Sequence, residues 1–147
     1  MPNAMPSLPP SSTPAAASRN VLAASQVTKT FREGREEVAV LNGVDIALGA
    51  GEIVALEGPS GSGKTTFLSI LGCILTPTSG RVVVDGEEID PRHPHWLPAI
   101  RKLSIGFIFQ QYNLFPALTA LENVEYALNI KGVKGRAARE PAEEALL

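Results

Sequence analysis

The stretch that decides the fold is residues 58–65, which read GPSGSGKT. It matches the pattern G-x-x-x-x-G-K-[ST] at every fixed position. Glycines let the backbone curl so that successive N–H groups point inward, in conformations that a Cβ would block. The lysine and hydroxyl residue that follow stand where a helix is expected to begin, and the positive end of a helix attracts anions. The pattern therefore predicts a loop that binds the phosphates of a nucleotide.

The segments on either side of this loop agree with that interpretation. Residues 53–56 are four consecutive apolar residues, typical of a parallel strand that is covered on both faces. Residues 64–75 switch to helical spacing with a wide apolar face, and strong helix breakers follow at 76–80. A buried strand before the loop and a helix after it favour nucleotide binding over an ordinary glycine-rich turn.

Each residue type in the loop has a chemical task. Lys64 is expected to reach the β- and γ-phosphates as a point charge. Thr65 would offer its hydroxyl to Mg²⁺, and Thr66 would offer a hydroxyl or N–H to the α-phosphate. Hydrogen bonds to charged groups are worth about 1.5–3 kcal/mol each, enough together to hold a triphosphate at micromolar to millimolar concentration. The expected nucleotide-binding residues of this loop are Gly58, Pro59, Ser60, Gly61, Ser62, Gly63, Lys64, Thr65 and Thr66.

The rest of the chain predicts an α/β domain preceded by a tail. Residues 1–18 carry no charge and are rich in proline, serine and alanine, which predicts a disordered segment. Further strands are expected within 21–48 and at 81–86 and 105–109. Further helices are expected in the last part of 91–103, at 118–130 and from 137 onward.

Composition excludes several classes of protein. The 147 residues carry 13 basic and 15 acidic side chains, so a net charge of −2 argues against a general nucleic-acid binder. The single cysteine, Cys73, cannot form an internal disulfide and is interpreted as a small core residue. His93 and His95 have the H-x-H spacing of some metal sites, but they are interpreted as solvated loop residues, and Trp96 as half-buried.

Two longer stretches resemble the ATP-binding subunit of ABC transporters. They are GEIVALEGPSGSGKTTFLSILGCILTPTSGRVVVDGEEI at 51–89 and IGFIFQQYNLFPALTALENV at 105–124. The resemblance covers roughly 21–147, and it is strongest to the branch that drives lipoprotein release and macrolide-type or lipid export. It implies a P-loop NTPase fold with an N-terminal antiparallel β subdomain, and ATP and Mg²⁺ as cofactors. It also implies a peripheral location on the cytoplasmic face of the membrane, with a separate membrane permease and a second, head-to-tail copy as partners.

The resemblance assigns roles to individual residues. Phe31 occupies the position of the aromatic residue that stacks on adenine, although a core phenylalanine at a strand end is the alternative. Gln110 matches the glutamine that approaches Mg²⁺ and the attacking water, so it joins Lys64 as a catalytic residue and Thr65 as a metal residue. As a neutral amide, Gln110 can orient a water but cannot act as a strong base. Residues 112–118 are expected near the surface that meets the permease.

The sequence also departs from the family pattern. It contains no signature loop resembling L-S-G-G-Q, no apolar strand ending in Asp-Glu and no matching switch histidine. The resemblance places all three beyond residue 147, so residues 19–147 are interpreted as a partial ATP-binding domain, truncated before the C-terminal part of its core. Such a chain is expected to bind Mg-ATP weakly or not at all, and to hydrolyse essentially none.

The sequence is also compatible with other functions. The chain could be a non-catalytic nucleotide-binding fragment, or the ATPase of an amino-acid importer, whose corresponding stretch is similar to QQYNLFPALTALENV. A different P-loop enzyme is disfavoured, because a GTPase should show N-K-x-D and a small nucleotide kinase an arginine-rich lid, and the sequence has neither.

Overall fold

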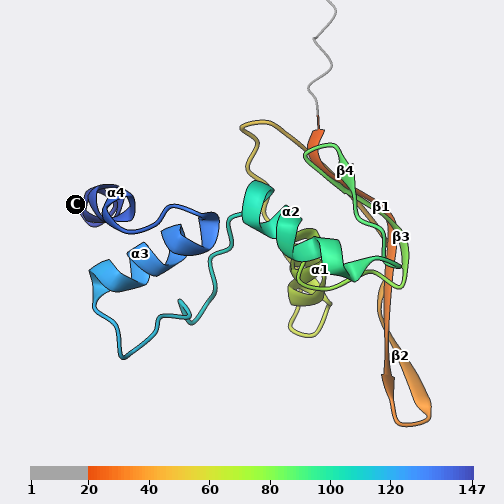
Figure 1. The fold of residues 1–147 in the computed structure, drawn as a ribbon. Helices are drawn as coiled ribbons and strands as arrows, with labels where there is room; N and C mark the ends of the chain where they lie inside the picture. The colour runs from red at the N-terminus through yellow and green to blue at the C-terminus, as the bar shows by residue number, and fades with distance from the viewer. Residues whose placement is uncertain (1–19) are drawn as a thin grey trace, which may run out of the picture.

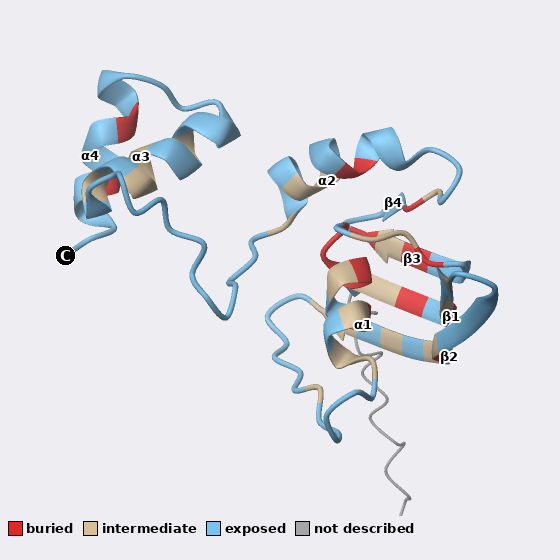
Figure 2. Ribbon diagram, turned by 90° about the horizontal axis from the view of Figure 1, so that it is seen from below, coloured by how far each residue is buried: buried red, intermediate tan, exposed pale blue. Residues whose placement is uncertain are grey.

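The computed structural model describes residues 20–147, so the predicted tail at 1–18 lies outside the described residues. The strands β1 (Asn20–Glu33) and β2 (Glu36–Gly49) form a long antiparallel ribbon. Strand β3 (Ser79–Val84) pairs antiparallel with the other edge of β1, and the short β4 (Glu87–Glu88) follows it. The resulting sheet, seen nearly edge-on in Figure 1, has the order β2-β1-β3-β4, which can be followed in Figure 2. This confirms the predicted N-terminal antiparallel β subdomain.

A bulge in β1 shapes the middle of this sheet. The pairing of β1 with β3 shifts between Ser25 and Thr28, and Gln26 has a left-handed φ of 50°. Asp45 on β2 fixes the bulge, because its two carboxylate oxygens accept the backbone N–H of Gln26 at 2.8 Å and its side-chain amide at 2.6 Å. Gly80 then passes so close to the bulge that a Cβ there would lie 2.6 Å from the Cα of Val27. A side chain at that point would push β3 off the sheet.

The helices fall into two groups. Helix α1 (Lys64–Leu71) and helix α2 (Leu97–Ser104), which follows the short 3-10 turn η1 (Pro94–Trp96), lie beside the sheet. Helices α3 (Ala120–Lys131) and α4 (Arg136–Glu144) pack on each other and stand away from the sheet, with mostly exposed surfaces (Figure 2). The helices predicted in the last part of 91–103, at 118–130 and from 137 onward are therefore confirmed, with small shifts at their ends.

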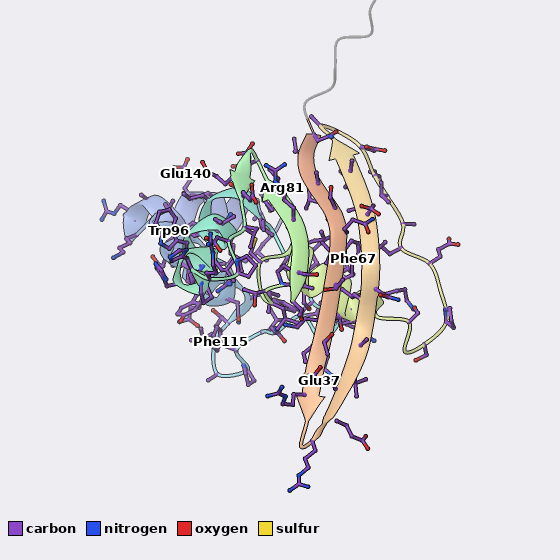
Figure 3. All side chains as sticks on the ribbon, turned by 90° about the vertical axis from the view of Figure 1, so that its right-hand side faces the viewer. Glu37, Phe67, Arg81, Trp96, Phe115 and Glu140 are labelled. Atoms are coloured by element: carbon purple, nitrogen blue, oxygen red, sulfur yellow. The ribbon has the colours of Figure 1, made fainter. Side chains whose placement is uncertain are left out.

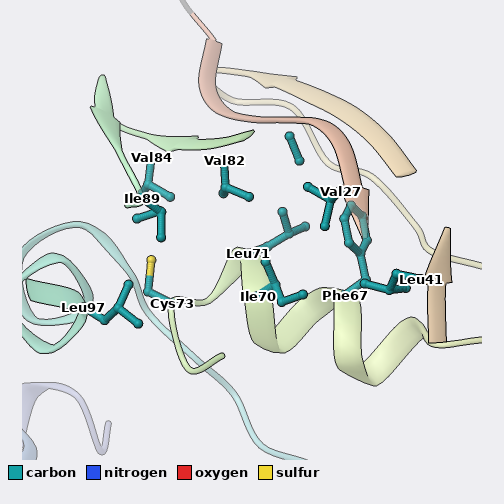
Figure 4. Packing of buried hydrophobic residues seen from close by; sticks show 11 residues of the cluster. Val27, Leu41, Phe67, Ile70, Leu71, Cys73, Val82, Val84, Ile89 and Leu97 are labelled. Carbon is teal, nitrogen blue, oxygen red and sulfur yellow. The ribbon is translucent and has the colours of Figure 1, made fainter. Parts of the chain in front are cut away.

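The buried core lies between α1 and one face of the sheet. Val27 and Val82 from the sheet meet Phe67 and Ile70 of α1, and all four side chains are buried (Figure 4). Each such side chain contributes about 1.5–3 kcal/mol when fully buried. Cys73 is also fully buried, as predicted, and burial raises the pKa of its thiol. The core therefore fixes α1 on the sheet, and with it the loop that precedes α1.

Two predicted strands were wrong. Residues 53–56 and 105–109 are irregular chain, and Ile53 and Ile108 are 96% and 93% exposed. The physical reason is that a parallel strand forms only beside a partner, and within residues 20–147 no strand pairs with either segment. Trp96 is 65% exposed instead of half-buried, because it ends a turn at the surface.

The helix predicted over 64–75 is also too long, since α1 ends at Leu71. Gly72 closes the helix, and its backbone N–H bonds to the carbonyl of Leu68 at 2.8 Å. Cys73 follows with a left-handed φ of 55°, which a continuing helix cannot accommodate. Of the apolar residues beyond Leu71, Cys73 is buried in the core whereas Ile74 is 41% exposed, so the apolar run there does not mark a helix face.

Candidate nucleotide-binding site

The phosphate loop predicted from the sequence leads directly into α1. Its glycines have backbone angles that disfavour side chains, with φ of 151° at Gly58, 80° at Gly61 and 86° at Gly63. Gly63 is also closely packed, because a Cβ there would lie 2.9 Å from both the carbonyl oxygen of Val40 and Cδ2 of Leu41. Residues of β2 therefore pack against the end of the loop, and only glycine fits at residue 63, directly before α1.

The side chain of Lys64 is held over the loop. Its ammonium nitrogen Nζ donates to the carbonyl oxygens of Gly58 at 2.8 Å and Pro59 at 2.7 Å, and it lies 3.3 Å from Oγ of Ser62. These acceptors are neutral, and in the described part of the chain Lys64 belongs to no ion pair. The loop thus carries a positive charge that no carboxylate of the described residues neutralises.

The backbone at the start of α1 adds further donors. Among residues 20–147, no protein group accepts a hydrogen bond from the N–H of Lys64, Thr65 or Thr66, and the first bond is that from Phe67 N to Gly63 O at 2.8 Å. The helix also has no side-chain cap and no acidic residue in its first turn. Open N–H groups at the positive end of a helix, next to an unneutralised ammonium, are suited to bind an anion.

Helix α1 holds these donors in a fixed place because its other face is buried. Phe67, labelled in Figures 3 and 4, reaches the sheet about one turn after Lys64 and is 3% exposed. Ile70 follows one turn later and is fully buried. The buried positions 67 and 70 therefore fix α1 on the sheet, and with it the residues 64–66 that are predicted to bind phosphate.

The residues at this site fit Mg²⁺ bound together with a nucleotide better than Mg²⁺ bound alone. The described residues contain no cluster of three or more His, Cys, Asp or Glu side chains that could hold a metal by themselves. Mg²⁺ commonly keeps several waters and takes one or two protein ligands in addition to the substrate phosphates. Thr65 is exposed beside the loop, and its carbonyl accepts a bond from Oγ of Ser69 at 2.8 Å. Its hydroxyl is suited to be such a single ligand.

Phe31 lies on β1, away from the buried cluster, and is 37% exposed. The ammonium of Lys29 lies 5.1 Å from the centre of its ring and also donates to the carbonyl of Thr76 at 2.8 Å. An aromatic ring with an accessible face suits stacking on a base. Adenine stacking by Phe31 stays a prediction.

Gln110 is exposed in a turn, and no hydrogen bond within the described residues joins it to the phosphate loop. The segment before it does reach α1, because the ring of Phe107 packs against Gly72 so closely that a Cβ there would lie 2.7 Å from Cε2. The structure thus brings residues 58–66 together and links Gln110 to them only through the far end of α1. Its role near Mg²⁺ stays a prediction.

The histidines behave as expected for loop residues. His93 and His95 are exposed, and Nδ1 of His93 lies 2.9 Å from Oδ2 of Asp90. Hydrogen bonds from Arg92 and His93 hold the pKa of the Asp90 carboxyl far below its usual range. Asp90 bonds to Arg92 and His93, and within residues 20–147 no hydrogen bond joins this surface group to the phosphate loop.

One residue that sequence reasoning missed is Asn123. Its side-chain amide bonds to the backbone of Phe115, Leu118 and Thr119, and so closes the loop that follows Gln110. The only sequence signal nearby is the Thr119-x-x-Glu122 pattern of a helix capping box, which the structure contains. That pattern marks the start of α3 but gives no hint of the contacts of Asn123.

The family is decided by comparison with known proteins. The family model described as ABC transporter matches residues 41–146 of this chain. The chain belongs to the ABC transporter ATP-binding family. This confirms the resemblance drawn from the motifs, and it identifies the fold as the ABC ATPase fold with its N-terminal antiparallel sheet.

Individual relatives support the same family assignment. The chain is 42% identical over 128 residues to the lipoprotein-releasing system ATP-binding protein LolD 1 of Caulobacter vibrioides, covering 86% of this chain and 55% of that protein. It is 43% identical over 120 residues to the macrolide export ATP-binding/permease protein MacB of Brucella abortus, covering 82% of this chain and 19% of MacB. Among solved structures, the chain superposes with a TM-score of 0.74 on the ATP-binding cassette MJ0796 of Methanocaldococcus jannaschii, in a dimeric post-hydrolysis state bound to ADP and Pi. The two sequences are 43% identical, and the match covers 85% of this chain and 55% of MJ0796.

The chain spans about half the length of the curated ATP-binding proteins that it matches. Among residues 20–147, no helix combines the length and the apolar character needed to cross a lipid bilayer.

Proposed function

We propose that residues 19–147 form the nucleotide-binding part of an ABC ATPase subunit, and that residues 58–66 hold Mg-ATP. The observation that carries this proposal is the pairing of the Lys64 ammonium, which no carboxylate in the described part of the chain neutralises, with the open N–H groups that begin α1. Both point to a multiply charged anion such as a triphosphate. The ADP and Pi bound to MJ0796 support the same ligand class for a relative at 43% identity.

The residues of this chain would divide the work of binding. Lys64 offsets charge on the β- and γ-phosphates, and the N–H groups of the loop fix their orientation. Bound Mg²⁺ would supply further compensation of the phosphate charge. Thr65 offers the metal a hydroxyl, Gln110 orients a water with its amide, and Phe31 stacks on the adenine.

The 147-residue chain alone is proposed to bind Mg-ATP weakly and to hydrolyse essentially none. No carboxylate among the described residues forms a hydrogen bond or ion pair with residues 58–66. A neutral amide such as that of Gln110 cannot take the proton of the attacking water. Hydrolysis by the whole protein would therefore need a base that lies outside the contacts of this loop.

The proposed partners are a membrane permease and a second ATPase copy. The names of LolD 1 and MacB favour a role in export or lipoprotein release at the cytoplasmic face of the membrane, and MJ0796 is described as dimeric. Within residues 112–118, Tyr112 is 76% exposed and Leu114 is 65% exposed. Such exposed apolar side chains support a contact with another protein at this loop.

The test is a titration of the chain with a fluorescent ATP analogue, with and without Mg²⁺, alongside a phosphate-release assay. Saturable Mg²⁺-dependent binding is expected, and Lys64→Ala should weaken it by about 1.5–3 kcal/mol. Lys134→Ala is the matched control, because Lys134 is exposed and lies outside the helices. Equal affinity for the native chain and Lys64→Ala would contradict the proposed site. Phosphate release that disappears in Lys64→Ala would contradict the absence of hydrolysis.

A further inference from the structure

The side chain of Asn123 fastens a loop to the first turn of α3. Its amide nitrogen Nδ2 donates to the carbonyl oxygens of Phe115 at 3.2 Å, Leu118 at 3.3 Å and Thr119 at 2.9 Å. Its oxygen Oδ1 accepts the backbone N–H of Phe115 at 2.8 Å. The amide therefore bonds to both the N–H and the C=O of Phe115, as a neighbouring strand would. Only a side chain with a donor and an acceptor side by side can make this pair of bonds.

Two neighbouring contacts strengthen the attachment. Glu122 accepts the backbone N–H of Thr119 at 2.7 Å, and Thr119 in turn accepts the N–H of Glu122 at 3.2 Å. The ring of Phe115, labelled in Figure 3, meets that of Tyr126 edge-on with 4.9 Å between centroids. The loop from Phe115 to Thr119 is thus held on α3 by side chains from two of its turns.

The other end of this loop is anchored on α1. Phe107 packs against Gly72, directly after α1, and its ring lies 4.5 Å from that of Phe109. The N–H of Tyr112 then bonds to the carbonyl of Phe109 at 3.0 Å, which closes a tight turn around Gln110. Tyr112 and Asn113 continue with left-handed φ of 57° and 51°. This conformation is common for asparagine but uncommon for tyrosine, so Tyr112 marks a tight turn of defined shape.

Gln110 therefore lies between two fixed points, one at the end of α1 and one at the beginning of α3. Helix α1 starts at Lys64 in the phosphate loop and spans roughly 12 Å over its length. The phosphate loop is linked to Asn123 by α1, by the packing of Phe107 on Gly72, by the hydrogen-bonded turn around Gln110, and by the chain that leads from Asn113 to Phe115. Contiguous contacts of this kind can carry a displacement from one element to another.

We propose that Asn123 is a positioning residue that fixes the loop after Gln110 to α3, so that a movement of Gln110 is passed to the first turn of that helix. The second half of this statement rests on the proposed function, in which Gln110 responds to bound Mg-ATP. The side chain is specific for the task. Alanine removes all four bonds, whereas aspartate keeps the acceptor for Phe115 N–H but points a negative oxygen at three carbonyls.

The test is amide hydrogen exchange on the full 147-residue chain, with Asn123→Ala and Asn123→Asp compared with the native sequence. The matched control is Asn129→Ala, because Asn129 is exposed on the same helix and its side chain has no hydrogen bond among the described residues. Without nucleotide, exchange at the Phe115 amide should rise about tenfold or more in both Asn123 variants. Exchange in β1 and α1 should stay unchanged, as should all exchange in Asn129→Ala.

The Asn123→Asp variant also distinguishes a role in positioning the loop from a general effect on the stability of α3. A negative charge in the first turn of a helix is normally stabilising, so Asn123→Asp should protect α3 if only helix stability matters. Faster exchange at Phe115 in this variant supports the positioning role. Unchanged exchange at Phe115 in Asn123→Ala overturns it. Exchange that rises equally in the core elements also overturns it, because Asn123 would then be merely structural.

Mg-ATP tests the transmitted movement. In the native chain, Mg-ATP should slow exchange both around Gln110 and in the first turn of α3, whereas in Asn123→Ala only the change around Gln110 should remain, with nucleotide affinity unchanged. If the native chain binds Mg-ATP without any change in exchange at the loop, the proposed transfer of movement from Gln110 to α3 is wrong, whereas the proposed nucleotide site is supported. If it binds no Mg-ATP, the proposed function fails, and the nucleotide-free comparison still decides whether Asn123 fixes the loop.

Discussion

Substituting Gly63 tests whether the phosphate loop is shaped by its contact with β2. In Gly63→Ala the residue would keep a left-handed φ of 86°, which costs an alanine about 1–2 kcal/mol. The new Cβ would also lie 2.9 Å from the carbonyl oxygen of Val40 and from Cδ2 of Leu41. Overpacking of this kind costs about 1–3 kcal/mol, and a strand carbonyl cannot move aside easily. The expected loss of unfolding free energy is therefore about 2–5 kcal/mol.

Gly61→Ala is the matched control, because Gly61 also has a left-handed φ, of 80°, but a Cβ there would meet nothing within 4 Å. Both variants are measured by urea unfolding followed by circular dichroism, with Gly63→Ala expected to be less stable than Gly61→Ala by about 1–3 kcal/mol. Equal stability of the two variants would refute the claim that β2 dictates glycine at residue 63.

Three further substitutions test other contacts. Phe31→Ala should weaken ATP binding by about 1–3 kcal/mol in a calorimetric titration and leave inorganic tripolyphosphate binding unchanged, because only ATP has a base to stack. Hydrogen bonds from Thr119 lower the pKa of Glu122, so this contact stabilises the folded chain above the usual carboxyl pKa and is lost as the pH falls through the lowered value. The helical circular dichroism signal should therefore fall on acidification below about pH 4, and Glu122→Gln should reduce this pH dependence. Gly72→Ala should cost about 1–3 kcal/mol of unfolding free energy by displacing Phe107, with part of the loss recovered when Phe107→Leu is added.

Sequence patterns predicted the parts of this fold that depend on neighbouring residues. The change from glycines to helical spacing at Lys64 marked the start of α1, and the helix predicted over 118–130 forms as Ala120–Lys131. The phosphate loop was visible for the same reason, because its glycines, lysine and hydroxyl residues are contiguous and each has a local task. The conformation of such a loop is determined by its own contiguous residues and can therefore be predicted from the sequence.

The features that the sequence did not predict depend on residues far away in the chain. The apolar runs 53–56 and 105–109 have the composition of strands but no pairing partner among the described residues, and composition cannot reveal whether a partner exists. Asn123 was missed for a related reason. Its four hydrogen bonds arise only because the chain at Phe115 turns back onto α3, and a single asparagine in a helix carries no sign of that return.

The most direct measurement is a nuclear magnetic resonance titration of the isotope-labelled chain with Mg-ATP, following the backbone amides. The largest shifts should occur at the open N–H groups of Lys64, Thr65 and Thr66 and in the glycines before them, since these groups are the proposed phosphate donors. The shifts should saturate and should be abolished by Lys64→Ala. Saturable shifts centred elsewhere, or shifts at 58–66 that persist in Lys64→Ala, would contradict the assignment of this loop as the nucleotide site.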